Sequence, residues 1–152
     1  MDFLKIFLVS MVPMVELRGA IPFSQYLGLP LIPSYLICIV GNMLPVPFIY
    51  LFARKVLVAG RNWPVVGNLF KWILDRGEKA GKKLMAKAGQ GTFLALLLFV
   101  GIPLPGTGAW TGTLAASILD MKFKETVAAV MLGVLLAGVI MMTASVLGFS
   151  LV

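Results

Sequence analysis

The sequence contains no histidine, a single cysteine and little charge. Because cysteine and histidine are the usual ligands of zinc and other transition metals, we expect no such metal site and no other cofactor. Cys38 cannot form a disulfide within the chain, and in its apolar surroundings it should act as a small hydrophobic residue. Charged residues are missing altogether from residues 19–53, 88–119 and 126–152. Uncharged stretches of this length are untypical of soluble proteins.

The residues that are present favour a membrane protein. Hydrophobic residues make up 60% of the 152, charged residues make up 12%, and the mean hydropathy is +1.00. We therefore predict a single integral membrane domain over residues 1–152. A secretory signal peptide is an alternative interpretation of the N-terminus, with Lys5 followed by the apolar residues 6–15. Acidic Asp2 and the lack of a small-x-small cleavage site argue against it.

Two apolar segments near the N-terminus are too short to cross a bilayer. About 20 apolar residues are needed to span the hydrocarbon core as a helix. Residues 3–12 and residues 20–29 each provide only about half of that number. Pro13 and a charged turn at residues 16–19 separate them. The simplest interpretation is a re-entrant helical hairpin, which enters the membrane, turns and leaves on the same side.

A second hairpin of the same kind is predicted later in the chain. Residues 92–102 and 109–119 are again short and apolar, and residues 103–108 form a turn rich in proline and glycine between them. Sliding the sequence on itself by about 90 residues places Pro13 on Pro103, which indicates an internal repeat.

Each hairpin leads into a segment of full spanning length, residues 34–53 and residues 126–150. A repeat with one returning hairpin and one crossing has an odd number of crossings, so its second copy must insert upside down. We predict an all-α integral membrane fold of two inverted repeats, residues 1–58 and 91–152, each a re-entrant helical hairpin plus one full transmembrane helix. A basic amphipathic linker helix, residues 59–90, joins them. Inverted repeats with broken helices are typical of transporters.

The basic residues predict the orientation. Nine of the thirteen lie within residues 54–87, and Lys122 and Lys124 are expected on the same face. Since cytoplasmic loops are enriched in Lys and Arg, we predict a cytoplasmic linker and both termini outside. The linker should lie on the inner surface, with Trp63 and Trp72 at headgroup level and its cations attracting anionic membrane lipids. This linker also explains the net charge of +7, so no nucleic-acid binding is expected.

Glu16 and Arg18 stand between the two short segments of the first hairpin. A charge at membrane depth costs roughly 2.5–3.5 kcal/mol and marks a candidate functional site. In one interpretation the two residues form a buried pair that fixes the hairpin. In the other, Glu16 exchanges a proton or a monovalent cation while Arg18 holds a substrate anion.

Asn42 is a further candidate because it lies where the first span is interrupted. Gly41, Pro45 and Pro47 surround it, and proline removes backbone hydrogen bonds that lipid cannot replace. The break is either a packing kink or a place where Asn42 faces a transport cavity. In the second span, small residues at four-residue spacing predict close helix packing, within the chain or across a dimer: Ala129, Gly133 and Ala137.

The turn of the second hairpin offers an anion site without a basic side chain. A new half-helix follows it, and the unpaired backbone N–H groups from about Thr107 to Thr111 would lie at the positive end of its dipole. The equivalent half-helix of repeat one should begin near Gly19. Alternatively, the Gly-Thr-Gly sequence merely permits a tight turn with a threonine cap. The full candidate site comprises Glu16, Arg18, Gly19, Asn42, Pro103, Pro105, Gly106, Thr107, Gly108, Trp110 and Thr111.

Two segments of the sequence resemble a known family. Residues 15–22, Val-Glu-Leu-Arg-Gly-Ala-Ile-Pro, and residues 102–112, Ile-Pro-Leu-Pro-Gly-Thr-Gly-Ala-Trp-Thr-Gly, are similar to the signature stretches of the putative small multidrug export proteins. The DedA superfamily is a more remote resemblance. The likeness implies a prokaryotic cytoplasmic-membrane protein, and related groups are associated with the translocation of polyprenyl-phosphate lipid carriers. Proteins of the DedA type place charges in both hairpins, whereas residues 88–119 here have none, so backbone N–H groups would have to suffice.

These observations together predict a small membrane transporter, not an enzyme. We expect a homodimer with alternating access, coupled to a proton or a monovalent cation, that carries an anionic amphiphile such as a polyprenyl phosphate. Export of small drugs is the alternative substrate class. A non-transporting assembly or pore-forming subunit is an alternative of another kind. An intramembrane enzyme is a third, for which only Glu16, serines and threonines would be available.

Overall fold

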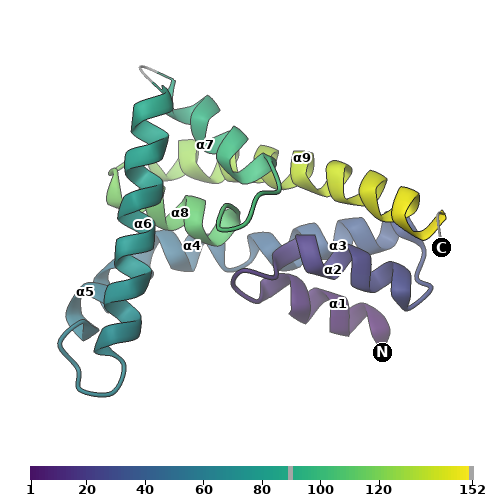
Figure 1. Ribbon diagram of the computed structural model, residues 1–152, viewed down its shortest axis with the longest axis horizontal. Helices are drawn as coiled ribbons and strands as arrows, with labels where there is room; N and C mark the ends of the chain where they lie inside the picture. Colours follow the sequence, from purple (N-terminus) through teal and green to yellow (C-terminus); the bar gives the residue numbers. More distant parts are fainter. Residues whose placement is uncertain (89–90, 151–152) are drawn as a thin grey trace.

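The computed structural model describes residues 1–88 and 91–150, and over these residues it contains helices and no strand (Figure 1). The all-α prediction is therefore confirmed. Residues 89–90 of the predicted linker and residues 151–152 of the predicted second repeat lie outside the described part. The elements are α1 (Asp2–Met11), α2 (Glu16–Tyr26), α3 (Leu31–Met43), α4 (Val46–Phe48), the π-helical turn η1 (Ile49–Ala53), α5 (Arg54–Gly60), α6 (Gly67–Ala88), α7 (Thr92–Gly101), α8 (Ala109–Ile118) and α9 (Phe123–Ser150).

The same order of elements occurs twice. A pair of short helices, α1 and α2, precedes the long segment that begins with α3, and the pair α7 and α8 precedes α9. Figure 1 shows the turns of the two pairs facing each other in the middle of the molecule, with α6 lying crosswise at the end opposite the termini. Residues Leu31–Phe52 and Phe123–Gly148 are long and apolar enough to cross a membrane, as expected from their hydropathy. The re-entrant path, the inverted repeat and the orientation remain predictions.

The first hairpin turns earlier than the sequence suggested. We expected the turn at residues 16–19 and a half-helix from about Gly19, but α2 already begins at Glu16, so Glu16 and Arg18 lie in its first turn. Pro13 follows the end of α1, and Met14 adopts a left-handed conformation with φ of 71°. The Glu16 N–H donates to the Val12 carbonyl at 3.0 Å, which closes the turn. The turn therefore occupies residues 12–15.

The first long segment is interrupted where its prolines are. The helix α3 ends at Met43, and the chain continues through the single turn of α4 into η1, which confirms the predicted break. The irregular backbone finds partners on the α8 side, because the Ser117 hydroxyl donates to the Tyr50 carbonyl at 2.9 Å. The Tyr50 hydroxyl in turn donates to the Met121 carbonyl. Such a break is tolerated in a membrane where protein satisfies the freed groups.

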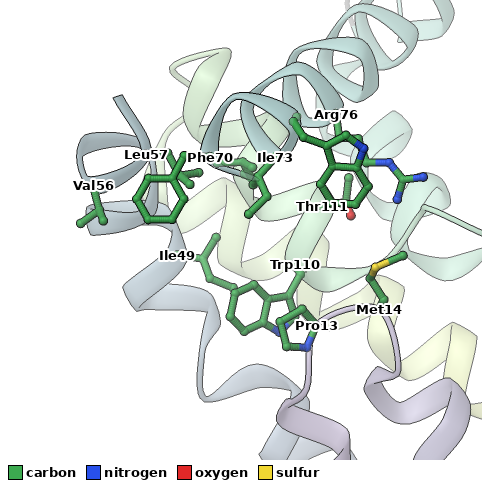
Figure 2. Close-up of a pocket in the computed structure, with 13 residues that line it drawn as sticks. Pro13, Met14, Ile49, Val56, Leu57, Phe70, Ile73, Arg76, Trp110 and Thr111 are labelled. Atoms are coloured by element: carbon green, nitrogen blue, oxygen red, sulfur yellow. The ribbon is translucent and has the colours of Figure 1, made fainter. Parts of the chain in front are cut away.

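The linker helix α6 packs on protein as well as presenting a polar face. Phe70 and Ile73 of α6 lie against a small buried cluster of Ile49, Leu57 and Leu114 (Figure 2). At Gly77 the approach is close, since an added Cβ would lie 2.9 Å from a methyl carbon of Leu114. The predicted amphipathic helix is present, and its apolar side covers α8, η1 and α5.

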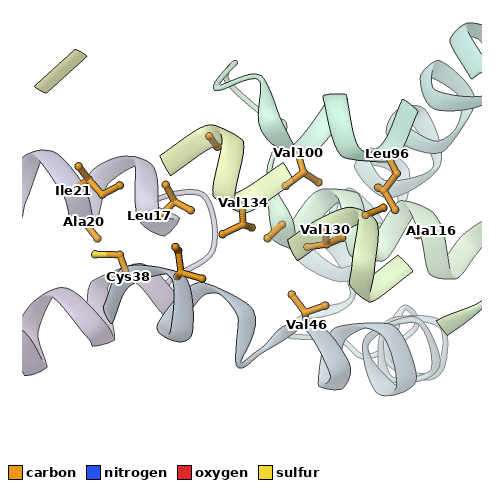
Figure 3. Packing of buried hydrophobic residues seen from close by; sticks show 14 of the residues in the cluster. Leu17, Ala20, Ile21, Cys38, Val46, Leu96, Val100, Ala116, Val130 and Val134 are labelled. Carbon is orange, nitrogen blue, oxygen red and sulfur yellow. The ribbon is translucent and has the colours of Figure 1, made fainter. Parts of the chain in front are cut away.

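The main core lies between the two halves of the chain and is built largely of small and branched residues (Figure 3). Ala129 and Ala137 of α9 are almost fully buried. A Cβ added at Gly133, which lies between them, would come within 2.7 Å of the Val100 Cβ and 2.8 Å of the Leu97 carbonyl oxygen. The predicted small-residue face is therefore confirmed as the surface on which α7 packs against α9.

A methyl group at Gly133 should destabilise the protein. Overpacking of a tight contact costs about 1–3 kcal/mol, so Gly133→Ala is expected to lower the Tm in detergent micelles, followed by circular dichroism. Gly148→Ala is the matched control in the same helix, because a Cβ there meets nothing within 4 Å. It should leave the Tm unchanged or raise it, since alanine favours the helix. Equal Tm values for the two variants would contradict the close α7–α9 contact.

Candidate functional site

The Glu16 carboxylate lies at the N-terminus of α8. Glu16 is buried, with only 3% of its surface exposed. One oxygen accepts the Trp110 N–H at 3.0 Å and the other accepts the Ala109 N–H at 3.2 Å. These are two of the N–H groups that a helix leaves unpaired at its start, and a negative charge there is stabilised by up to about 2 kcal/mol in partly buried sites. Glu16 is thus the anion bound by the second hairpin.

The backbone of Glu16 is held in an uncommon conformation. Its φ is 52°, in the left-handed region that few residues other than glycine adopt. Such conformations cost of order 1–3 kcal/mol and persist only where the surroundings fix them, often at functional sites. The contact with α8 is an interaction that offsets this cost.

Arg18 binds the C-terminal end of α7 and the turn that follows it. Its guanidinium donates to the carbonyls of Leu104 at 2.6 Å, Thr107 at 2.8 Å and Val100 at 3.2 Å, and to the Thr107 hydroxyl at 2.9 Å. The Val100 carbonyl lies in the last turn of α7, where the helix dipole favours a cation. Glu16 and Arg18 therefore carry charges of the sign that each helix end prefers.

Glu16 and Arg18 do not form an ion pair with each other within 4 Å. Ion pairs of that length within the described part of the chain include Lys5–Asp2 and Lys122–Glu125, both on the surface. The partners of Glu16 and most partners of Arg18 are backbone groups of the second hairpin. The two charges thus hold the hairpins together, rather than only fixing the first one.

Trp110 adds a third connection between the hairpins, because its indole N–H donates to the Met11 carbonyl at the end of α1, at 3.1 Å. Thr107 orders the turn itself, with its hydroxyl 3.0 Å from the Ile102 carbonyl and 2.9 Å from that of Leu104. We call this set of contacts between residues 11–18 and residues 100–110 the tip junction.

Two glycines shape the turn for different reasons. Gly106 has a φ of 80°, and an added Cβ would meet nothing within 4 Å. Gly108 has a φ of 136°, and a Cβ there would lie 2.8 Å from the Glu16 carboxyl carbon. Only Gly108 is therefore needed for the approach of the carboxylate as well as for its own backbone conformation.

The structure brings together five of the candidate residues: Glu16, Arg18, Thr107, Gly108 and Trp110. Pro103, Pro105 and Gly106 lie in the same turn without a hydrogen bond to either charge. The Gly19 N–H already donates to the Val15 carbonyl at 3.0 Å, so the expected second helix N-terminus is not free there. Asn42 is buried in α3, where neither its amide oxygen nor its nitrogen has a hydrogen-bond partner among the described residues. It takes no part in the tip junction.

A cavity of about 300 Å³ adjoins the tip junction (Figure 2). Trp110 and Thr111 of α8 form one wall and Pro13 and Met14 of the first turn another. The remaining walls come from η1, α5 and α6: Ile49, Val56, Leu57, Phe70, Trp72, Ile73, Arg76 and Gly77, with Leu114 of α8. These wall residues were not predicted as part of a site, because the linker was expected only to lie on the membrane surface. The apolar face of α6 is the feature of the sequence that could have indicated them.

Residues 16–140 match the family model described as putative small multi-drug export protein. The chain belongs to this family. The match begins at Glu16 and includes Glu16, Arg18 and the turn of the second hairpin. No curated protein and no solved structure shows significant similarity to the chain. Family membership and the two long apolar helices together identify the chain as a membrane protein.

The contact between Gly108 and Glu16 can be tested with a double-mutant cycle. Gly108→Ala should lower the Tm more than Gly106→Ala does, because both place alanine at positive φ but only the former displaces the carboxylate. In a Glu16→Ala background the extra cost of Gly108→Ala should shrink, with a coupling of about 1 kcal/mol or more. Additive effects in thermal unfolding would show that Gly108 and Glu16 are not in contact.

Proposed function

We propose that this protein is a transporter that moves an anionic amphiphile across the membrane, with α1–α2 and α7–α8 as re-entrant hairpins. The helices α1 and α7 have 10 residues each. A helix of that length reaches only about 15 Å, half of the hydrocarbon thickness of about 30 Å. Two such hairpins that enter from opposite sides would meet near the bilayer centre, which agrees with the facing turns in Figure 1.

The proposed orientation places α6 on the cytoplasmic surface and both termini outside. In Figure 1 α6 runs across the direction of α3 and α9, as expected for a helix lying along a membrane that those two cross. Its exposed residues include Lys71, Lys79 and Lys82, and basic residues are retained on the cytoplasmic side. An inverted repeat of this kind supports alternating access around a central site.

The observation that carries the proposal is the Glu16 carboxylate on the N–H groups of Ala109 and Trp110. A helix N-terminus that holds a tethered carboxylate can hold the phosphate or carboxylate of a substrate in the same place. Substrate and Glu16 then compete for one site, and protonation of Glu16 favours the exchange by removing its charge. Arg18 is the charged side chain near this carboxylate, and residues 88–119 contribute no other.

Exchange at this site also provides a way to open and close the protein. With Glu16 in place, the tip junction connects the two hairpins. When a substrate anion replaces the carboxylate, one of its connections is released and the hairpins can move relative to each other. We propose that Arg18 keeps the α7–α8 turn ordered in both states, and that two copies of the chain form the complete transporter. A polyprenyl phosphate is the proposed substrate, and a proton the proposed coupling ion.

Transport can be measured with a fluorescent farnesyl phosphate in proteoliposomes carrying a pH gradient. We expect wild type to move the probe at a rate that depends on the gradient, and Arg18→Ala to lose at least about 90% of it, since several charge-assisted hydrogen bonds are removed. Arg61→Ala, on the exposed surface, is the control and should retain the rate. Equal rates for wild type and Arg18→Ala, with both proteins folded, would refute the site.

Coupling is tested by Glu16→Gln, which keeps the size of the side chain but cannot exchange a proton. In wild type, binding of an alkyl sulfonate, whose own charge is constant between pH 6 and 8, should weaken as pH rises, by at most about tenfold per unit for one proton. Glu16→Gln should bind it with an affinity independent of pH. A pH dependence that survives this substitution would exclude Glu16 as the coupling group.

Export of small drugs is the second candidate function, favoured by the apolar, aromatic and methionine-containing walls of the cavity. A cationic dye in the same vesicles distinguishes the two, because preferential movement of the dye over farnesyl phosphate would favour drug export. Steady leakage of unrelated solutes would favour a pore-forming subunit.

A further inference from the structure

The cavity beneath α6 has a polar and an apolar side. In Figure 2 Arg76 and Thr111 lie toward one side of the view, whereas Val56, Leu57 and Phe70 lie toward the other. Among the described residues that line the cavity, Arg76 carries the one charge, and no acidic side chain faces it. A ligand that fits this arrangement has an apolar body and an anionic end.

The side chain of Arg76 is preorganised to bind an anion. Its guanidinium carbon lies 4.5 Å from the ring centre of Trp72, one turn earlier in α6. Stacking on an aromatic ring restricts the side chain while leaving its N–H groups free for a carboxylate or phosphate. No ion pair of Arg76 with a described acidic residue competes for them.

The size of the cavity limits the apolar part of the ligand. About 300 Å³ lies at the lower end of the range for small-molecule sites, roughly 300–1,000 Å³. The α6 residues along it run from Phe70 to Gly77, a distance of about 10 Å along the helix axis. These dimensions fit one alkyl or isoprenoid chain of medium length, and not the paired chains of a phospholipid.

We propose that this cavity binds a single-chain anionic amphiphile, with its tail between Phe70, Leu57 and Ile49 and its anionic group on Arg76. The inference deepens the proposed function, on which its role in transport rests, by adding an entry site that takes a single chain. Trp110 links the two sites, because its side chain lines the cavity while its backbone N–H donates to the Glu16 carboxylate. An amphiphile bound at Arg76 would therefore lie next to the N-terminus of α8.

Three brominated probes of equal chain length test the charge preference. 11-Bromoundecanoate, 11-bromoundecanol and 11-bromoundecyltrimethylammonium each carry the quenching bromine at the end of the tail. In a Trp63→Phe/Trp72→Phe variant, Trp110 is the remaining tryptophan and lines the cavity. Its fluorescence in non-brominated micelles should be quenched saturably by the anion, with an affinity about tenfold above that for the cation.

Two matched variants separate specific binding from partitioning into the micelle. A Trp72→Phe/Trp110→Phe variant keeps Trp63, which is 60% exposed and does not line the cavity, and it should show only unsaturable quenching. In the Trp110 reporter, Arg76→Gln should weaken binding of the anion about tenfold and leave the alcohol unchanged, whereas Arg76→Lys should restore part of the loss.

Equal affinity for anion and cation, an unchanged anion affinity in Arg76→Gln, or saturable quenching at Trp63 would overturn the proposal. The quenching assay measures binding and not transport. Its result therefore does not depend on the outcome of the Glu16→Gln test. Conversely, if pH-coupled transport persists and no anion binds at Arg76, the proposed binding site in the cavity is wrong and the proposed function stands.

Discussion

The backbone ends of α7 and α8 determine how this fold is held together. α7 ends and α8 begins at one turn, where the last carbonyls of α7 and the first N–H groups of α8 have no partners within their own helices. Arg18 donates to the Val100 carbonyl of α7 and to the Leu104 carbonyl of the turn, and Glu16 accepts the first N–H groups of α8. The charges are costly in an apolar chain only when considered alone. Against the second hairpin they match the two helix ends in sign and in hydrogen-bonding capacity.

This constraint explains features that otherwise have no common cause. Gly108 lacks a side chain because the carboxyl group of Glu16 occupies the space, and Glu16 adopts a left-handed backbone conformation at the start of α2. The second hairpin needs no charge of its own, because the first provides both. A junction made from one carboxylate and two backbone N–H groups is also reversible, since another anion can take the same donors. Stability and the proposed transport cycle thus depend on the same contact.

Much of this architecture could be predicted from the sequence. Hydropathy and length identify the long helices and the short pairs, the prolines predict the break after α3, and the scarcity of charge singles out Glu16 and Arg18. Their partners could not be predicted, because the contacts join residues more than 80 positions apart through backbone atoms that every residue possesses. The start of α2 was missed because a left-handed glutamate has no signature in the sequence. The cavity was missed because its walls come from η1, α6 and α8, which are brought together only by tertiary packing.

In the proposed cycle, Glu16 occupies the N-terminus of α8 until a substrate anion replaces it. Solid-state NMR in bilayers measures this directly, through the dipolar coupling between the Glu16 carboxyl carbon and the Trp110 backbone nitrogen, with carboxyl-¹³C glutamate, ¹⁵N tryptophan and the other two glutamates changed to glutamine. We expect a strong coupling in the empty protein and its loss when farnesyl phosphate saturates the site. No coupling in the empty protein, or a coupling that saturating ligand leaves unchanged, would contradict it.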